Sequence, residues 1–225
     1  MRQVVHPTCL FISPSNTVRS SMFQTMITWV VTGGIGCGKS SLLSLLQESC
    51  GARSVVIFSS DAAVTQILSR SDVLACLQDM FGPEAVNASG VCREWLRAEV
   101  LPVPDKRAML EKLLHPRVLA MLETAREQAQ ASGCNLFLAE VPLHYEIGAT
   151  VSADFVIVVA SSPSVQVRRM MEKRGLDEHT VQKFLQAQWP IEAKVERADV
   201  VIWNDGSLAS LEAQVLTLAS PLLQA

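Results

Sequence analysis

A loop suited to phosphate binding lies near the start of the chain. Residues 33–40 read Gly-Gly-Ile-Gly-Cys-Gly-Lys-Ser, which satisfies the pattern G-x-x-x-x-G-K-[ST] at every fixed position. In this pattern glycines let the backbone curl so that N–H groups point at an anion. Lys39 would then reach the β- and γ-phosphates of a nucleoside triphosphate, and the Ser40 hydroxyl would ligate Mg²⁺. The predicted nucleotide contacts are Gly33, Gly34, Ile35, Gly36, Cys37, Gly38, Lys39, Ser40 and Ser41.

The segments on either side of the loop have the character that such a site requires. Residues 27–32 form a short, apolar and β-branched run that is typical of a buried parallel strand. Residues 40–48 carry leucines at helical spacing, and Gly51 is placed to end a helix. A strand, a glycine loop and a helix in this order favour a real phosphate site over a chance match.

The rest of the chain alternates between strand and helix patterns. Four more runs have strand character, at residues 54–58, 136–139, 155–159 and 200–203, and all are continuously apolar. Helical patterns occupy residues 62–68, 72–80, 94–100, 105–130, 164–173, 178–188 and 208–218. This alternation predicts an α/β fold with a parallel five-stranded sheet and helices on both faces. Ligands of such sheets bind at the carboxyl ends of the strands.

One part of the chain interrupts the alternation. Residues 62–132 are almost wholly helical and too long for a simple crossover, which predicts an inserted substrate-binding subdomain. Within it, Pro116 is expected to kink or break the long helix near His115. Residues 1–26 contain no acidic residue and two prolines, and we expect a disordered tail or a start codon assigned too early. In the latter case Met22 or Met26 is the true start, and residues 27–225 form the folded domain.

Composition excludes several classes of protein. Apolar residues make up 49% of the 225, enough for the core of one domain, and a net charge of -3 with no basic stripe argues against nucleic-acid binding. No apolar stretch is long enough to span a bilayer. The six cysteines are scattered without C-x-x-C spacing, which is typical of reduced thiols in a cytoplasmic protein. We expect small-molecule partners, and a monomer or weak homo-oligomer.

Acidic residues follow two of the predicted strands. Asp61 comes after the second strand, which we expect to lie next to the strand of the phosphate loop, and could accept a proton from an acceptor hydroxyl. The alternative is that Asp61 caps a helix beginning at Ala62, and the two roles are compatible. Glu140 ends the next strand and could be a second acid near Mg²⁺, or a structural acid bonded to loop N–H groups.

Other candidate residues are cationic or reactive. Arg168, Arg169, Lys173 and Arg174 could close over the triphosphate as a lid with Gly175 as hinge, although most such clusters are solvated helix faces. A helix N-terminus could lower the pKa of Cys37, although a small packed residue is the simpler interpretation. His115 would ordinarily be a packed or capping residue. Trp189 and Trp203 suit the core or the side of an adenine ring.

An ordered set of segments runs through about residues 27–219. It consists of Thr32–Ser40, Asp61, Phe81-Gly82, Leu114-His115-Pro116, Val141-Pro142-Leu143, Glu146, Gln188, Lys194, Ala198-Asp199-Val200, Ile202, Asn204 and Gly206. This set resembles the dephospho-CoA kinase family. The resemblance implies a P-loop kinase fold and transfer of the ATP γ-phosphoryl group to the ribose 3′-hydroxyl of dephospho-CoA, with Mg²⁺.

The same resemblance assigns roles to individual residues. By the resemblance, Asp61 matches the family's proposed base. Lys39 and Arg169 are the other predicted catalytic residues, and Ser40 and Glu140 are the predicted metal ligands. Residues 62–132 resemble the CoA-binding insert, and residues 164–188 the lid. Asn204 and Gly206 are implied on the nucleotide, and His115, Arg117, Lys173 and Arg174 on the acceptor.

The chain also departs from the family pattern. Ser59-Ser60-Asp61 replaces a frequent Asp-x-Asp, Cys37 replaces a serine, and Lys173 stands where a second lid arginine is common. The usual Asp-Arg pair is displaced or missing around residues 90–94. Another small-molecule kinase of the nucleoside or nucleotide type is the main alternative. A nucleotide-dependent switch is less favoured because no N-K-x-D segment is present.

Overall fold

The computed structural model describes residues 11–12, 26–51, 54–148 and 151–223, and the chain divides into two compact units. The first, here called the sheet unit, is built from the chain up to Phe58 and from Gln128 onward. The second, the helical unit, spans Ser59–Glu127. The expected tail over residues 1–26 lies outside the described residues, except for residues 11–12 and 26.

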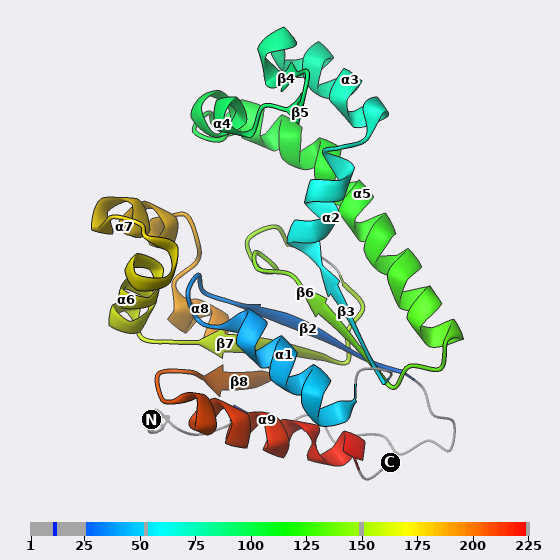
Figure 1. The fold of residues 1–225 in the computed structure, drawn as a ribbon, viewed down its shortest axis with the longest axis vertical. Helices are drawn as coiled ribbons and strands as arrows, with labels where there is room; N and C mark the ends of the chain where they lie inside the picture. The colour runs from blue at the N-terminus through cyan, green and yellow to red at the C-terminus, as the bar shows by residue number, and fades with distance from the viewer. Residues whose placement is uncertain (1–10, 13–25, 52–53, 149–150, 224–225) are drawn as a thin grey trace. The chain divides into compact units, whose positions relative to one another are not determined.

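The sheet unit contains the five strands predicted from the apolar runs (Figure 1). They are β2 (Ile27–Gly33), β3 (Val55–Ser59), β6 (Leu136–Glu140), β7 (Phe155–Ala160) and β8 (Val200–Trp203). The sheet order is β1-β8-β7-β2-β6-β3, and β2 pairs in parallel with both β6 and β7. A sixth strand that the sequence did not predict, β1 (Phe11–Ile12), pairs antiparallel with β8 at the edge.

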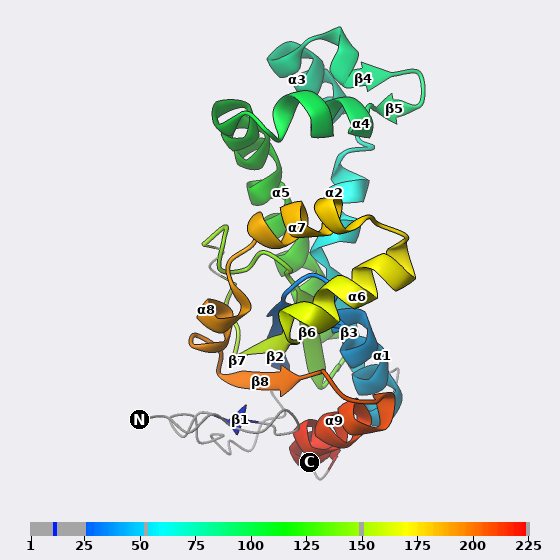
Figure 2. The same cartoon turned by 90° about the vertical axis from the view of Figure 1, so that its left-hand side faces the viewer.

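Helices cover this sheet because its central strands are apolar on both faces. Every residue of β2 after Ile27 is buried, as expected where helices pack on either side. Figures 1 and 2 show α1 (Lys39–Cys50) on one face, beside α9 (Leu208–Leu223), and α8 (Ile191–Val195) on the other. The core includes Leu42 and Leu46 of α1 and Leu211 and Val215 of α9. The unit is completed by α6 (Pro163–Arg174) and α7 (Glu178–Gln186).

The helical unit has its own apolar core. It comprises α2 (Ser60–Ile67), α3 (Ser71–Phe81), a 3₁₀ turn (Pro83–Ala85), β4 (Val86–Asn87), β5 (Gly90–Val91), α4 (Arg93–Trp95), a π-helical turn (Leu96–Val100) and α5 (Pro104–Ala131), whose end lies in the sheet unit. Ile67, Leu77 and Val100 are fully buried in this core. Figure 2 shows the β4–β5 hairpin, which the sequence did not predict, beside α3.

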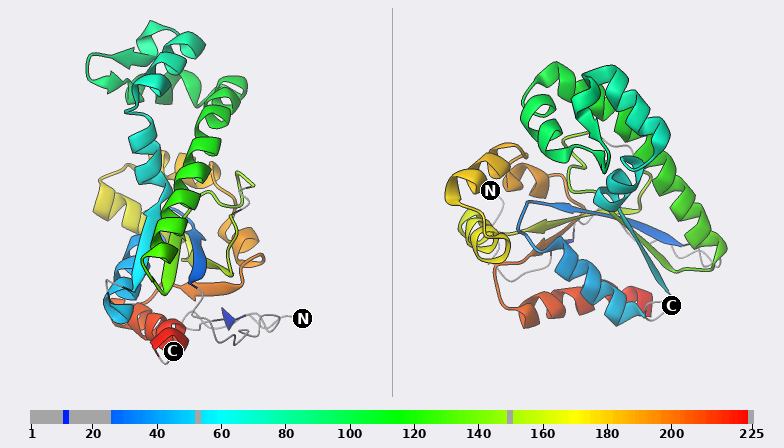
Figure 3. Two further views of the ribbon diagram at one scale, coloured as in Figure 1. Left: turned by 90° about the vertical axis from the view of Figure 1, so that its right-hand side faces the viewer. Right: turned by 45° about the horizontal axis from the view of Figure 1, so that its top comes forward.

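The long helix is not broken at Pro116, and the other expectation, a kink near His115, stays a prediction. Helix α5 runs from Pro104 to Ala131 with Pro116 inside it, and it is drawn without interruption in Figure 3. Proline removes one backbone N–H donor from a helix. Apolar side chains on both sides of the proline, Leu114 before it and Val118 after it, pack into the core of the helical unit and hold the helix across the gap. Among the described residues no helix is long and apolar enough to cross a membrane.

Candidate active site

The predicted strand, loop and helix are present in that order. Strand β2 ends at Gly33, and α1 begins at Lys39 with Gly38 as its N-cap in the left-handed region, at φ 92° and ψ 31°. A Cβ atom on Gly33 would overlap the backbone carbonyl of Val159 in the neighbouring strand. A side chain at either position would therefore strain or displace the loop. The fixed glycines of the pattern are required by this geometry.

The three polar side chains at the start of α1 differ in their surroundings. Lys39 Nζ donates to the carbonyl oxygens of Gly33 (3.3 Å) and Gly34 (3.0 Å), so the ammonium lies inside the curve of the loop. Ser40 is exposed, and Ser41 is half-buried. Because α1 starts here, its free N–H groups and its dipole favour an anion at this point.

Asn204 supports the loop through its side chain. Asn204 follows β8, and its side-chain Nδ2 donates to the Cys37 carbonyl at 2.8 Å. Its backbone carbonyl accepts from the Ser161 hydroxyl at 2.8 Å. Asn204 is only 6% exposed. Its amide is therefore committed to the loop backbone, which the sequence interpretation of Asn204 as a nucleotide contact did not anticipate. Gly206, two residues further on, is exposed.

The suggestion that a helix end lowers the pKa of Cys37 is wrong. The Cys37 side chain is completely buried, and this burial raises the pKa of its thiol against a smaller opposing effect of the Lys39 ammonium. A buried thiol with a raised pKa is a poor nucleophile. The competing interpretation, a small packed residue, agrees with this burial.

Among the contacts of the described residues, Arg169 is the cation of α6 that bonds the phosphate loop. Its guanidinium donates to the Gly36 carbonyl (3.5 Å) and to the Ser161 hydroxyl (3.1 Å). Lys173 and Arg174 lie at the exposed end of α6, which terminates at Gly175 in the left-handed conformation. Arg169 thus lies on the loop, whereas Arg168, Lys173 and Arg174 are exposed to solvent.

The order of the strands corrects one expectation about the acids. Strand β3, which precedes Asp61, is not adjacent to β2, because β6 lies between them. The acid at the end of the strand that does adjoin β2 is Glu140, opposite Val31 in the parallel register. Sequence order placed Asp61 nearer the loop strand, but parallel strands need not be neighbours in the order in which they occur along the chain.

Asp61 does not cap the helix that follows β3. Helix α2 begins at Ser60, and its N-cap is Ser59, whose hydroxyl accepts from the Ala62 N–H. Asp61 occupies the first turn of α2 and is exposed. Its carboxylate is therefore not used by the cap, and its place in the first turn favours the helix through the dipole.

The remaining predicted acceptor residues lie on α5. His115 and Arg117 are both half-buried in the helical unit, and Arg117 Nη1 donates to the Leu113 carbonyl at 2.8 Å. Arg117 and Leu113 are one helical turn apart, as is common where a side chain bonds the backbone of its own helix.

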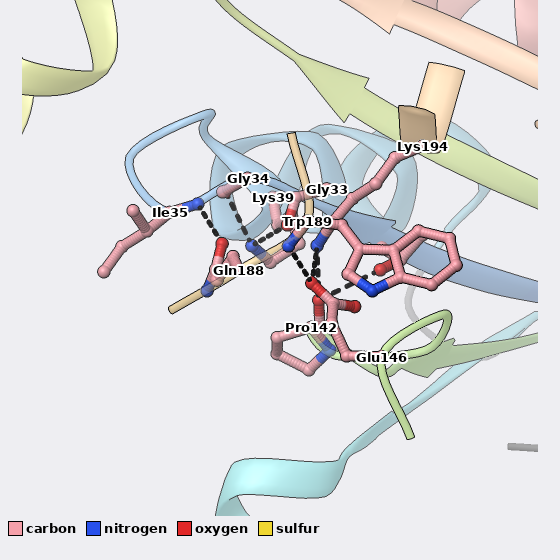
Figure 4. A network of polar contacts seen from close by, with 10 residues as sticks. Gly33, Gly34, Ile35, Lys39, Pro142, Glu146, Gln188, Trp189 and Lys194 are labelled. Carbon is pink, nitrogen blue, oxygen red and sulfur yellow. Dashed lines mark hydrogen bonds and ion pairs between the residues drawn. The ribbon is translucent and has the colours of Figure 1, made fainter. Parts of the chain in front are cut away.

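A buried polar network beside the loop has no counterpart in the sequence interpretation (Figure 4). Lys194 of α8 is fully buried and pairs with Glu146 at 2.6 Å. Both residues appeared in the sequence analysis only as part of the family pattern. Two charged residues far apart in a chain carry no sequence signal that they will form an ion pair. Beside them, Tyr145 stacks on Trp189 with ring centroids 6.2 Å apart, and burial raises the pKa of Tyr145 to about 12.

Comparison with known proteins gives the family. The family model described as dephospho-CoA kinase matches residues 27–210, which include the loop, the helical unit and helices α6 to α8. The chain belongs to the dephospho-CoA kinase family. A dephospho-CoA kinase of Syntrophotalea carbinolica is 35% identical over 203 residues, covering 88% of this chain and 93% of the relative. One of Corynebacterium glutamicum is 35% identical over 189 residues, covering 82% and 94%.

Solved structures share the fold of this chain. The structure of TT1252 from Thermus thermophilus has a TM-score of 0.75 at 30% identity and covers 88% of this chain and 98% of that one. Dephospho-CoA kinase from Campylobacter jejuni, at 23% identity and a TM-score of 0.58, shares the fold over 88% of this chain and 98% of its own. The predicted P-loop kinase fold and the family resemblance are both confirmed.

Proposed function

We propose that this chain transfers the γ-phosphoryl group of ATP to the ribose 3′-hydroxyl of dephospho-CoA, giving CoA and ADP. The observation that carries the proposal is the formed phosphate loop, with Lys39 inside its curve and Arg169 on its rim, in a chain that matches the family over residues 27–210. Phosphoryl transfer depends mainly on positioning and charge stabilisation, which these groups supply.

The proposed roles combine the sequence pattern with the immediate surroundings of each residue. Lys39 and the loop N–H groups hold the phosphates of ATP, and Arg169 neutralises charge that develops on the transferring group. Asp61 orients or deprotonates the acceptor hydroxyl, a role for which its exposed carboxylate is available. His115, Arg117, Lys173 and Arg174 are the proposed contacts to the acceptor. Lys173 and Arg174 also belong to the proposed lid.

The residues near the loop fit Mg²⁺. The Ser40 hydroxyl and the Glu140 carboxylate are hard oxygen donors of the kind that this ion prefers. Over residues 26–51, 54–148 and 151–223, no group of three or more His, Cys, Asp and Glu side chains is placed to hold a metal ion. This agrees with Mg²⁺, which commonly takes one or two protein ligands and completes its shell with substrate phosphates and water. When bound, the ion would neutralise negative charge on the phosphates.

The first test is an assay of ADP release with ATP and Mg²⁺. Dephospho-CoA and a panel of nucleosides and nucleotides are offered as acceptors, and the position of the new phosphate is read by ³¹P NMR. We expect turnover with dephospho-CoA alone and a 3′-phosphate in the product. Turnover with a nucleoside instead would replace the proposed acceptor, and slow ATP hydrolysis that no acceptor stimulates would favour a switch protein.

A second test addresses Asp61. Asp61→Asn keeps the size of the side chain but removes the base, and we expect kcat to fall roughly 10²–10⁴-fold while ATP still binds. Asp79→Asn, which changes an exposed aspartate on α3 of the same unit, is the matched control and should leave kcat unchanged. A kcat within twofold of the unmodified chain for Asp61→Asn would remove Asp61 from the chemistry.

A further inference from the structure

The ion pair between Glu146 and Lys194 is buried more deeply than stability alone explains. The Lys194 side chain is 0% exposed and that of Glu146 is 13% exposed, and Nζ lies 2.6 Å from Oε1. Removing two charges from water is costly, and replacing a buried pair by apolar residues of similar volume often leaves a protein as stable or more so. The other hydrogen bonds of Lys194 and Glu146 therefore indicate what the pair does.

One contact of the pair reaches the base of the phosphate loop. Lys194 Nζ donates to the Pro142 carbonyl at 3.4 Å, and the same carbonyl accepts from the Thr32 hydroxyl at 3.1 Å. Thr32 directly precedes Gly33, where the loop leaves β2. The ammonium thus reaches the start of the loop through a single carbonyl oxygen.

The other contact reaches the tip of the loop. Glu146 Oε1 accepts from the Trp189 backbone N–H at 3.0 Å, which fixes the turn between α7 and α8. In the same turn, Gln188 Oε1 accepts from the Ile35 N–H of the loop at 3.1 Å (Figure 4). Gln188 thus holds the Ile35 peptide at the loop tip in one orientation. The next residue, Trp189, is bonded through its backbone to Glu146.

We propose that Glu146 and Lys194 are positioning residues for the nucleotide, which hold the Gln188–Trp189 turn so that Gln188 fixes the tip of the phosphate loop. The inference rests on the ATP-binding part of the proposed function and goes beyond it, because neither residue belongs to the loop or to the lid cations. Loop N–H groups bind phosphate well only if they are aligned in advance. Loss of the pair frees the turn, and ATP must then order the tip on binding.

The experiment measures the Kd for ATP by titration calorimetry on folded variants. Gln188→Met removes the acceptor for the Ile35 N–H, and losing one such hydrogen bond should raise the Kd roughly 3–10-fold. Glu146→Met/Lys194→Met removes the pair without leaving an unpaired charge, and we expect a similar rise with little change in Tm. The control is Glu123→Met/Arg126→Met, which removes an ion pair of 2.9 Å on α5 and should not change the Kd.

The decisive comparison is the triple variant that combines Gln188→Met with the pair replacement. If the pair acts through Gln188, the triple variant binds ATP no more weakly than either parent. Multiplication of the two effects, or an unchanged Kd in the pair variant, would overturn the proposal. Should the pair variant fail to fold, Glu146→Gln replaces it, since it keeps the volume and weakens both bonds. An unchanged Kd in that variant likewise refutes the role.

The binding measurement does not use an acceptor. Its result is therefore independent of whether dephospho-CoA is the substrate, which the ADP-release assay decides. In that assay, we expect the variants to change the KM for ATP and to leave the KM for the acceptor unaltered. A purely structural role would lower the amount of folded enzyme and leave both KM values unchanged.

Discussion

Replacing Gly38 by alanine should disturb the loop through a single identified contact. Gly38 is at φ 92°, where an alanine costs about 1–2 kcal/mol. Its Cβ would also overlap Asn204 Nδ2, which must move and lose its 2.8 Å hydrogen bond to the Cys37 carbonyl. Leaving that buried carbonyl unpaired costs about 1–3 kcal/mol. The sum is about 2–5 kcal/mol, or a fall in Tm of roughly 4–20 °C for a chain of this size.

Thermal unfolding without nucleotide measures this loss, because bound ligand would add its own stabilisation. Gly133→Ala is the matched control for backbone strain, since Gly133 is at φ 73° and no heavy atom lies within 4 Å of its added Cβ. Its Tm should fall only by the contribution of the backbone strain at positive φ. Gly38→Ala/Asn204→Ala should be no less stable than Gly38→Ala, because the hydrogen bond is already lost.

Two outcomes would refute this reasoning. If Gly38→Ala and Gly133→Ala lose equal stability, the contact with Asn204 has no energetic effect. If Asn204→Ala lowers the Tm by the same amount with and without Gly38→Ala, the two residues are not coupled.

Two further predictions concern ionisable groups. Iodoacetamide should alkylate buried Cys37 more slowly than half-buried Cys76 in the folded chain and equally fast in urea, as followed by peptide mass spectrometry; equal rates in the folded chain would contradict the burial. Tyr145 ionises near pH 10 when unfolded and near pH 12 when folded, so the free energy of unfolding should fall between pH 10 and about 12. Tyr145→Phe should lack this part of the fall. At pH 7 it should be at least as stable, because the hydroxyl is buried and has no hydrogen-bond partner among the residues that the structure describes. An identical pH profile for both proteins in urea unfolding would contradict the assigned cause.

The local elements were predictable because their signals are local. Apolar runs indicated β2, β6, β7 and β8, and the fixed glycines indicated where β2 gives way to α1. Helix ends were less certain, as Ser59 shows: it caps α2 in place of Asp61. Several neighbouring residues could serve as a cap, and their sequence alone does not decide between them.

What the sequence did not indicate depends on tertiary packing. In the sheet, β6 lies between β2 and β3. The apolar pattern of each strand does not indicate this order. Helix α5 continues through Pro116 because residues on both sides are buried, which outweighs the local preference of proline.

Site chemistry shows the same division. Cys37 is buried in a core that includes residues far from it in the sequence, such as Val159 and Ile202, and this burial raises the pKa of its thiol. The meeting of Glu146 with Lys194 likewise depends on segments distant in sequence. Residue types and spacing identified the phosphate loop. They did not indicate which groups outside it keep it in place.

The resting position of Lys39 has a consequence for how tightly a nucleotide can bind. A lysine side chain that is free in solution carries about 2 kcal/mol of rotamer entropy, which an incoming phosphate would ordinarily have to remove. Here the ammonium already lies against the carbonyls of Gly33 and Gly34, so much of that ordering has occurred when the chain folds. Folding, rather than ligand binding, bears that entropic cost, and a phosphate meets a cation that is already in place.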